Sequence, residues 1–191
     1  VLNETLDNPS NLTLFGTSLS IYGNYAIVGA RITNGAAYIY KRHGDNWVLN
    51  QTLENPGSGD FFGYSISING HYAIISSWAI NDGKAYIYKR KIQGNSDTWV
   101  LNETLISPSI ITFGASVSIH GDYAIVGTDK STGGKAYIYK KSGDDWIKIN
   151  EVINTTSTLF FGWSVSIHGD YAIVGSSKTT GQAFIYKLRP S

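Results

Sequence analysis

Four copies of one sequence unit, each close to 48 residues long, most constrain what this chain can fold into. The dipeptide Phe-Gly begins each copy, and successive copies are 47, 51 and 48 residues apart, beginning near Phe15, Phe62, Phe113 and Phe161. The segment HGDYAIVG stands at 120–127 and again, unchanged, at 168–175. Self-similarity with a period of this length is typical of architectures in which each unit packs on its neighbours.

Each unit contains four segments typical of short β-strands. The first alternates serine with aliphatic residues, as in SISI at 65–68, the next two resemble YAIVG and AYIYK, and in complete copies the fourth begins at a tryptophan. Period-two alternation and short β-branched or aromatic runs indicate strands rather than helices. The glycine of HGDY lies where a tight hairpin turn accepts a positive φ. We therefore predict an all-β chain with almost no helix.

The unit length and pattern predict a four-bladed β-propeller of four-stranded antiparallel blades, forming a single domain over residues 1–191. A four-stranded unit cannot bury both of its faces alone, so the copies must pack on one another. The YAIVG run carries side chains that can be buried on both faces, as a blade flanked by two others requires.

The two ends of the sequence indicate how the ring is closed. The last copy stops after its third strand, AFIYK, whereas residues 1–6, VLNETL, match the fourth-strand segments VLNQTL at 48–53 and VLNETL at 100–105. We therefore expect residues 1–6 to complete the last blade by pairing with the strand that contains residues 183–187. The alternative is an open array to which further repeats belong.

The motif FGxSxSI, a Gly-Asp or Gly-Asn turn, YAIVGA and G(A/K)AYIYK together resemble the FG-GAP repeat, the blade unit of the integrin α-subunit propeller and of many secreted repeat proteins. The resemblance covers nearly the whole chain. It implies an extracellular or cell-surface location, with adhesion and ligand binding, and some integrin-like propellers are lectins. Integrin repeats often carry a DxDxDG-like calcium loop, but the nearest carboxylate run here is Asp144-Asp145, so we expect no metal and no cofactor.

Composition removes several classes of partner. Fifteen Lys and Arg against fourteen Asp and Glu give a net charge of +1, which does not favour nucleic acid or an anionic membrane. No apolar run approaches the roughly 18 residues that a membrane span requires, so no membrane insertion is expected. The chain has no cysteine, which excludes disulfides and thiolate catalysis.

The candidate catalytic residue types all follow the repeat. His120 and His168 share one turn position, where Tyr22 and Asn69 stand in the other copies, and His43 and His71 suggest no metal cluster with them. No Ser, His or Asp breaks the pattern in the way that a catalytic residue would. We therefore expect no enzyme activity, and a propeller hydrolase is the weakest of the alternatives.

Most aromatic residues occupy repeated positions and are expected to pack between blades. Trp78 and Trp163 break the repeat, which makes them candidates for ligand contact. The loops between second and third strands vary most and should share one face of the propeller. The predicted ligand-binding residues, of which most lie on that face, are Arg31, Trp78, Asn81, Asp82, Asp129, Lys130, Trp163 and Lys178. The alternative is that these loops are only solvated.

Five N-x-[ST] sequons mark candidate glycosylation sites: Asn3, Asn11, Asn50, Asn102 and Asn154. Three of these, Asn3, Asn50 and Asn102, repeat one position of the outer strand, where the exposed rim of a propeller tolerates a glycan.

Taken together, these features predict a non-enzymatic extracellular module for adhesion, protein interaction or assembly of a surface polymer. Its partner would be another protein or a second copy of the chain. The alternative function is a lectin with shallow glycan sites on the variable-loop face.

Overall fold

The computed structural model describes residues 1–10, 13–31, 34–57, 61–79, 83–94, 96–107, 112–128, 133–153, 160–177 and 181–188. Fifteen β-strands and no helix lie within these ranges, which confirms the all-β prediction. Within the same ranges, therefore, no helix is long and apolar enough to span a membrane.

The strands form four antiparallel sheets in chain order, one for each copy of the repeat. The first sheet contains β1 (Phe15–Tyr22), β2 (Tyr25–Ala30), β3 (Ala36–His43) and β4 (Asn46–Glu54). The second contains β5 (Phe62–Asn69), β6 (Tyr72–Ser77), β7 (Lys84–Gln93) and β8 (Ser96–Ile106). The third contains β9 (Phe113–His120), β10 (Tyr123–Thr128), β11 (Lys135–Ser142) and β12 (Asp145–Ile153). The fourth contains β13 (Phe161–His168), β14 (Tyr171–Ser176) and β15 (Gln182–Lys187).

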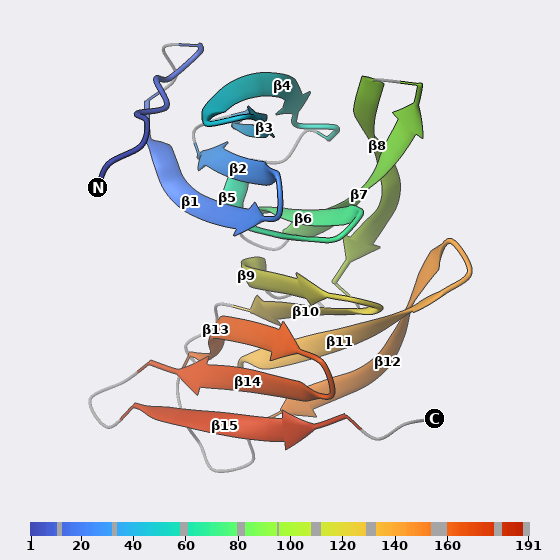
Figure 1. Ribbon diagram of the computed structural model, residues 1–191. Helices are drawn as coiled ribbons and strands as arrows, with labels where there is room; N and C mark the ends of the chain where they lie inside the picture. The colour runs from blue at the N-terminus through green and yellow to red at the C-terminus, as the bar shows by residue number, and fades with distance from the viewer. Residues whose placement is uncertain are drawn as a thin grey trace.

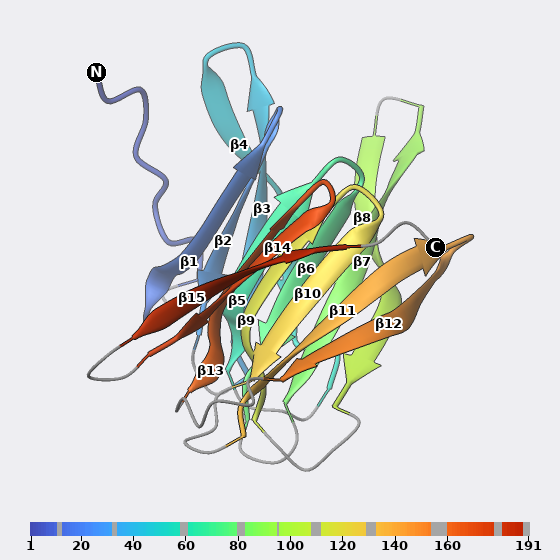
Figure 2. The same cartoon turned by 90° about the horizontal axis from the view of Figure 1, so that it is seen from below.

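The sheets are stacked as successive propeller blades, with the first at the top and the fourth at the bottom of Figure 1. The inner strand of each blade packs on the inner strand of the next, so that β1 contacts β5, β5 contacts β9 and β9 contacts β13. The tight hairpins between first and second strands lie at one end of the stack, and the second strand of each blade ends at the other (Figure 2). The chain is therefore a four-bladed β-propeller whose second strands all end on one side, which we call the variable-loop end.

The Phe-Gly dipeptide marks the place where neighbouring blades meet backbone to backbone. Gly63 has a φ of 84°, which disfavours any other residue, and it follows directly on Phe62, which is fully buried. A Cβ atom on Gly63 would lie 2.5 Å from the carbonyl oxygen of Ala36 in the first blade. The glycine of the dipeptide has a positive φ of 84° to 91° in all four copies, which explains why it recurs in each.

The apolar core lies between the blades rather than at one centre. In the first of these layers, Ile27 and Ile39 of the first sheet pack with Ile75 and Tyr86 of the second, and all four are at most 2% exposed. Equivalent layers join the second sheet to the third and the third to the fourth. Tyr86 and Tyr137 pack in these layers as predicted, whereas their repeat partner Tyr38 is buried in a separate cluster on the first sheet.

The alternating serines of the first strand have a role that the repeat pattern alone did not reveal. Their hydroxyl oxygens accept hydrogen bonds from backbone N–H groups on the free edge of the next blade's inner strand. The oxygen-to-nitrogen distances are 3.0 to 3.2 Å. The pairs are Ser18 with Ile66, Ser20 with Ile68, Ser65 with Val117, Ser67 with Ile119 and Ser118 with Ile167. We call these contacts the serine ladder. They satisfy edge groups that would otherwise remain open for unwanted pairing.

The predicted closure of the ring is not found. The fourth sheet has three strands, β15 pairs only with β14, and residues 1–8 lie outside any strand. The reason is geometric, because the serine ladder and the Phe-Gly contacts fix how each blade sits on the last. Stacked in this way, the four blades place the first and fourth sheets at opposite ends of the array (Figure 1).

Residues 1–6 instead lie against the first sheet. The Nδ2 atom of Asn3 donates to the carbonyl oxygen of Asp45 at 2.7 Å, and Glu4 accepts the N–H of Trp47 at 2.7 Å. Leu6 packs on the apolar cluster that contains Tyr38. In the second blade the same contacts come from β4, since Asn50 donates to the carbonyl oxygen of Asp97. The segment therefore occupies the place of a preceding blade's outer strand.

Candidate functional site

Two of the predicted ligand residues meet at the variable-loop end, through an aromatic residue that the sequence analysis did not single out. The guanidinium carbon of Arg31 lies 4.9 Å from the ring centroid of Tyr64, and that ring stacks on Trp78 with centroids 5.5 Å apart. Arg31 extends from the end of β2 in the first blade, whereas Tyr64 and Trp78 belong to the second. The stack therefore bridges two blades, and cation–π and aromatic contacts of this kind stabilise such a junction.

Trp78 is held by packing on two sides. Its ring also contacts Phe61, with centroids 5.8 Å apart, and the side chain is half-buried. Its indole Nε1 atom is buried and has no hydrogen-bond partner among the described residues. Trp78 therefore acts in this stack through its ring rather than through its indole nitrogen.

Trp163 does not join this stack. It occupies the Tyr64 position in the fourth blade, is 45% exposed, and packs edge-on against Phe160 with centroids 5.9 Å apart. The two non-repeated tryptophans therefore differ, since Trp78 is a packing residue and Trp163 presents its ring to solvent. The other predicted loop residues, Asn81, Asp82, Asp129, Lys130 and Lys178, lie outside the described residues.

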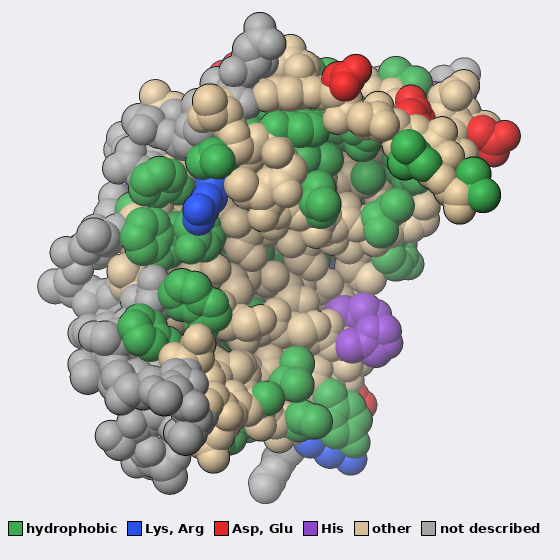
Figure 3. Space-filling model, turned by 90° about the vertical axis from the view of Figure 1, so that its left-hand side faces the viewer, with side chains coloured by type: hydrophobic (Ala, Val, Ile, Leu, Met, Phe, Trp, Pro, Cys, Tyr) green, Lys and Arg blue, Asp and Glu red, His purple; other side chains and the backbone are tan. Residues whose placement is uncertain are grey.

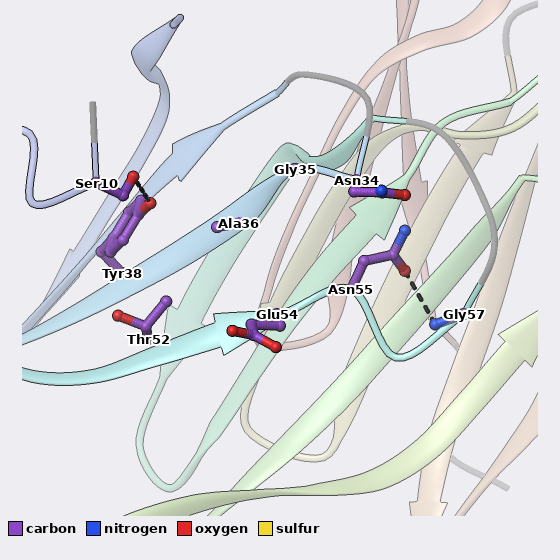
Figure 4. A pocket seen from close by; sticks show the side chains of 9 residues that line it. All are labelled: Ser10, Asn34, Gly35, Ala36, Tyr38, Thr52, Glu54, Asn55 and Gly57. Carbon is purple, nitrogen blue, oxygen red and sulfur yellow. Dashed lines mark hydrogen bonds between the residues drawn. The ribbon is translucent and has the colours of Figure 1, made fainter. Parts of the chain in front are cut away.

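A cavity of about 490 Å³ opens beside the first sheet (Figure 4). Its lining comes from residue 10 and from β3, β4 and the residues beside these strands: Ser10, Asn34, Gly35, Ala36, Tyr38, Thr52, Glu54, Asn55 and Gly57. The hydroxyl groups of Ser10 and Tyr38 are hydrogen-bonded, and Asn55 accepts the N–H of Gly57 at 3.1 Å. With a carboxylate, amides and hydroxyls around it, the cavity suits a polar ligand. Its residues follow the repeat, so no sequence signal marked them.

The repeated sequon asparagines serve the contacts between blades. Asn3, Asn50 and Asn102 each donate from Nδ2 to a backbone carbonyl oxygen of a neighbouring hairpin, at Asp45, Asp97 and Asp144. Asn3 is exposed, whereas Asn50 and Asn102 are half-buried. The repetition of this position thus has a structural cause beside the predicted glycosylation. Asn11 and Asn154 lie outside the described residues.

Ion pairs join the blades at the hairpin end. Lys41 of the first blade lies 2.5 Å from a carboxylate oxygen of Asp97 in the second, and Tyr25 donates its hydroxyl to the same oxygen. The pKa of Asp97 is held below its usual value, chiefly by the hydrogen bond from Lys41 and, to a smaller extent, by that from Tyr25. Lys89 and Asp144 repeat the pair between the second and third blades. These charged residues are therefore explained by blade packing.

The rings of the two histidines of the repeated HGDY turn are in tilted contact. The ring centroids of His120 and His168 lie 4.0 Å apart, and the Nδ1 atom of His120 accepts the N–H of Gly169 at 3.1 Å. Burial, followed by the charge of His168, lowers the pKa of His120. The sequence analysis assigned these residues to the same turn position in two copies of the repeat, and only the packing of the blades brings their rings together. Among the described residues, no three His, Cys, Asp or Glu side chains form a group suited to a metal ion.

Both ends of the blade stack expose apolar strand residues. On the first sheet, Leu19 and Ile21 are 66% and 67% exposed, and on the fourth, Ile173 and Ile185 are 40% and 72% exposed. Figure 3 views the side on which the first sheet lies above and the fourth below, where hydrophobic side chains are visible over both parts and charged ones are few. We call the exposed apolar surface on β1 the first end face and that on β13 to β15 the fourth end face; beside β1, Val28 and Tyr38 of the first sheet are buried under Leu6 and Phe15.

The FG-GAP repeat family matches the chain at residues 52–88 and 155–186. These two regions cover most of the second blade up to β7 and most of the fourth blade up to β15. The match confirms the resemblance that the four Phe-Gly copies indicated. No curated protein matches the chain.

Proposed function

Because the chain carries FG-GAP repeats, folded as the blades of a β-propeller, we propose that it is a non-enzymatic extracellular module for adhesion, protein interaction or polymer assembly. One observation carries the proposal, namely the exposure of both end faces. Ile185 is 72% exposed, whereas its repeat partners Ile39, Ile87 and Ile138 are fully buried. Contiguous apolar surface of this kind typically marks a protein interaction site.

A non-enzymatic role is supported by the contacts of the polar side chains, which join neighbouring blades. Charged groups with shifted pKa values, such as Lys41, Asp97 and Lys89, owe the shift to partners in a neighbouring blade. The pKa of Tyr88 is raised to about 12 by burial. In a catalytic site, residues with shifted pKa values converge on one cleft. Here the residues with shifted pKa values are instead distributed over successive blade junctions.

An extracellular or cell-surface location is supported by the sequons and by the family resemblance. Asn3 is exposed, so its side chain is accessible to a modifying enzyme. Neither the net charge of +1 nor the composition favours nucleic acid or a membrane as the partner.

Adhesion of coated beads tests the proposed function. Beads carrying the chain should adhere to cells or extracellular material of the source organism, and Ile185→Lys should reduce adhesion. Ile92→Lys is the matched control, because Ile92 is 57% exposed near the tip of the β7–β8 hairpin, away from both end faces. Beads that adhere no better than beads carrying an unrelated β-protein would contradict the proposal.

Glycan binding at the variable-loop end is the second candidate. The solvent-facing ring of Trp163 favours it, because sugars stack on exposed aromatic rings. A glycan array should then show binding that Trp163→Ala abolishes and Ile185→Lys preserves. Binding lost with Ile185→Lys instead would assign the activity to the end face.

A further inference from the structure

We propose that the fourth end face docks on the first end face of a second copy of this chain, head to tail. The inference rests on the proposed function and names its partner. The three blade-to-blade junctions inside the chain show which groups such a contact requires. One side of a fourth junction of this kind lies on the first end face, and the other side lies on the fourth end face.

The apolar half of the junction is present at each end. Inside the array, Tyr25, Ile27 and Ile39 of the first blade are at most 5% exposed, because the second blade covers them. Their repeat partners on the fourth blade are Tyr171, Ile173 and Ile185, which are 52%, 40% and 72% exposed.

The opposite side of the junction is open at β1 of the first blade, whereas Val28 and Tyr38 beside it are covered by Leu6 and Phe15. Ile66 and Ile68, which the first blade covers, are 5% and 4% exposed. Their partners Leu19 and Ile21 are 66% and 67% exposed.

The serine ladder is also interrupted at both ends. Ser18 and Ser20 accept from Ile66 and Ile68, and the ladder continues to Ile167 in the fourth blade. Ser164 and Ser166 hold the same positions on β13 and are exposed. The register of the repeat aligns them with the N–H groups of Leu19 and Ile21, so docking would extend the ladder by one step.

Charge complementarity points to the same contact. At the hairpin end, Lys41 pairs with Asp97 and Lys89 pairs with Asp144, each reaching from one blade to the next. Lys187 stands at the Lys41 position in the fourth blade, where its ammonium lies over the ring of Tyr171. Asp45 stands at the Asp97 position in the first blade and is exposed. Docking would therefore join Lys187 of one copy to Asp45 of the other.

The backbone surfaces have matching shapes. A Cβ atom on Gly29 would lie 2.2 Å from the carbonyl oxygen of Gly63, because the two blades touch there. At the free ends, Gly16 has no atom within 4 Å of such a position, and Gly175 meets only Ser164 of its own sheet, at 3.5 Å. Both glycines thus leave the space that a close backbone approach would fill.

Residues 1–6 complete the fit. They already lie on the first blade where a preceding blade's outer strand would lie, held by Asn3 and Glu4. Docking would carry them alongside β15, whose outer edge pairs with no strand among the described residues. By the register of Leu53 opposite Ala37, Leu6 of one copy would face Ala183 of the other. The strand pairing expected within one chain would then form between two.

The occupant is a second copy because one chain cannot bring its own two faces together as it is folded. Figure 1 places the first and fourth sheets at opposite ends of the stack, and the backbone contacts at each junction resist a change of that arrangement. Head-to-tail contacts form a ring if the rotation between copies closes, and a filament if it does not. Either assembly contains the proposed contact.

Light scattering over a concentration series tests the proposal. The purified chain should form species of twice the monomer mass or more, in a fraction that rises with concentration. Ile185→Lys should weaken association by about tenfold or more, since a charge would enter a buried junction. Ile92→Lys should leave it unchanged. A monomer of 20.9 kDa at every concentration would overturn the proposal.

A charge exchange tests the orientation of the two copies. Asp45→Lys alone and Lys187→Glu alone should each weaken association, because each places like charges at the contact. An equimolar mixture of the two variants should restore it, because every head-to-tail contact in the mixture can again pair opposite charges. Association that neither variant weakens would overturn the proposed contact, as would a mixture that stays monomeric. A monomeric chain whose beads still adhere would overturn self-docking while leaving the proposed function in place.

Discussion

The hydroxyl oxygen of Ser65 lies 3.0 Å from the backbone nitrogen of Val117 and accepts its N–H across the boundary between the second and third blades. The bond satisfies an edge group of β9 that no other strand reaches. Ser65→Ala should therefore lower the free energy of unfolding by about 1 to 3 kcal/mol, the cost of an unsatisfied buried donor. Urea unfolding measures it. Ser164→Ala is the matched control, since Ser164 holds the same repeat position and is exposed, and equal losses in both variants at high dilution would contradict the ladder's role.

Gly83 should not tolerate a side chain. A Cβ atom there would lie 1.9 Å from the carbonyl oxygen of Phe113 in the next blade, and backbone cannot yield as a flexible side chain would. We expect Gly83→Ala to cost about 1 to 3 kcal/mol of stability by overpacking. Gly181 holds the same repeat position in the fourth blade, is exposed, and gives the control. Thermal melting of the two variants should separate them, and a Gly83→Ala protein as stable as the wild type would contradict the tight junction.

Acid should loosen the junction between the third and fourth blades. Burial and the neighbouring His168 lower the pKa of His120 in the folded chain below its ordinary value of 6.5. The unfolded chain then binds the proton more readily, so stability is present above about pH 6.5 and is lost as the pH falls toward the lowered value. Measuring the free energy of unfolding between pH 8 and roughly pH 5 tests this.

His120→Asn is the matched variant for that measurement. Asn69 holds the same position in the second blade and accepts the N–H of Gly121 at 3.0 Å, as His120 accepts that of Gly169. The variant therefore keeps the acceptor and loses the titrating group, and its stability should fall less with pH. An identical pH dependence in both proteins would show that His120 is not responsible.

Removing residues 1–7 should destabilise the first blade and leave the fourth unchanged in the monomer. Leu6 packs on the cluster around Tyr38, and Glu4 accepts the N–H of Trp47. Hydrogen exchange should accordingly quicken at Trp47 and elsewhere in β4, with β15 unaffected at high dilution. Faster exchange in β15 with β4 unchanged would instead indicate that the segment pairs with the last blade of its own chain.

The two tryptophans that break the repeat should respond differently to truncation. Trp78 packs between Phe61 and Tyr64, so Trp78→Ala should cost about 2 kcal/mol or more of stability. Trp163 is 45% exposed, and Trp163→Ala should change stability by about 0.5 kcal/mol or less, as surface substitutions usually do. Chemical denaturation measures both changes, and equal losses would contradict this division between packing and exposed residues.

The sequence by itself determined the strands, their hairpins and their grouping into four blades, because these depend on local patterns that recur at a fixed period. Glycine in the HGDY turn and the alternation in SISI act within a few residues of themselves, so they can be interpreted without knowing what lies opposite. The predicted burial of Tyr86 and its repeat partners follows from the same logic. The FG-GAP resemblance rests on this local level too.

Only the tertiary structure decided what crosses from one blade to the next. The acceptor role of Ser65, the ring contact of His120 with His168 and the Arg31–Tyr64–Trp78 stack join residues that no local pattern connects. Ring closure was predicted from matching sequence at the two ends, yet whether two strands meet depends on the angle summed over three junctions. That angle is set by close backbone contacts, in which small displacements matter because the packing is dense. Residue types alone do not specify such displacements.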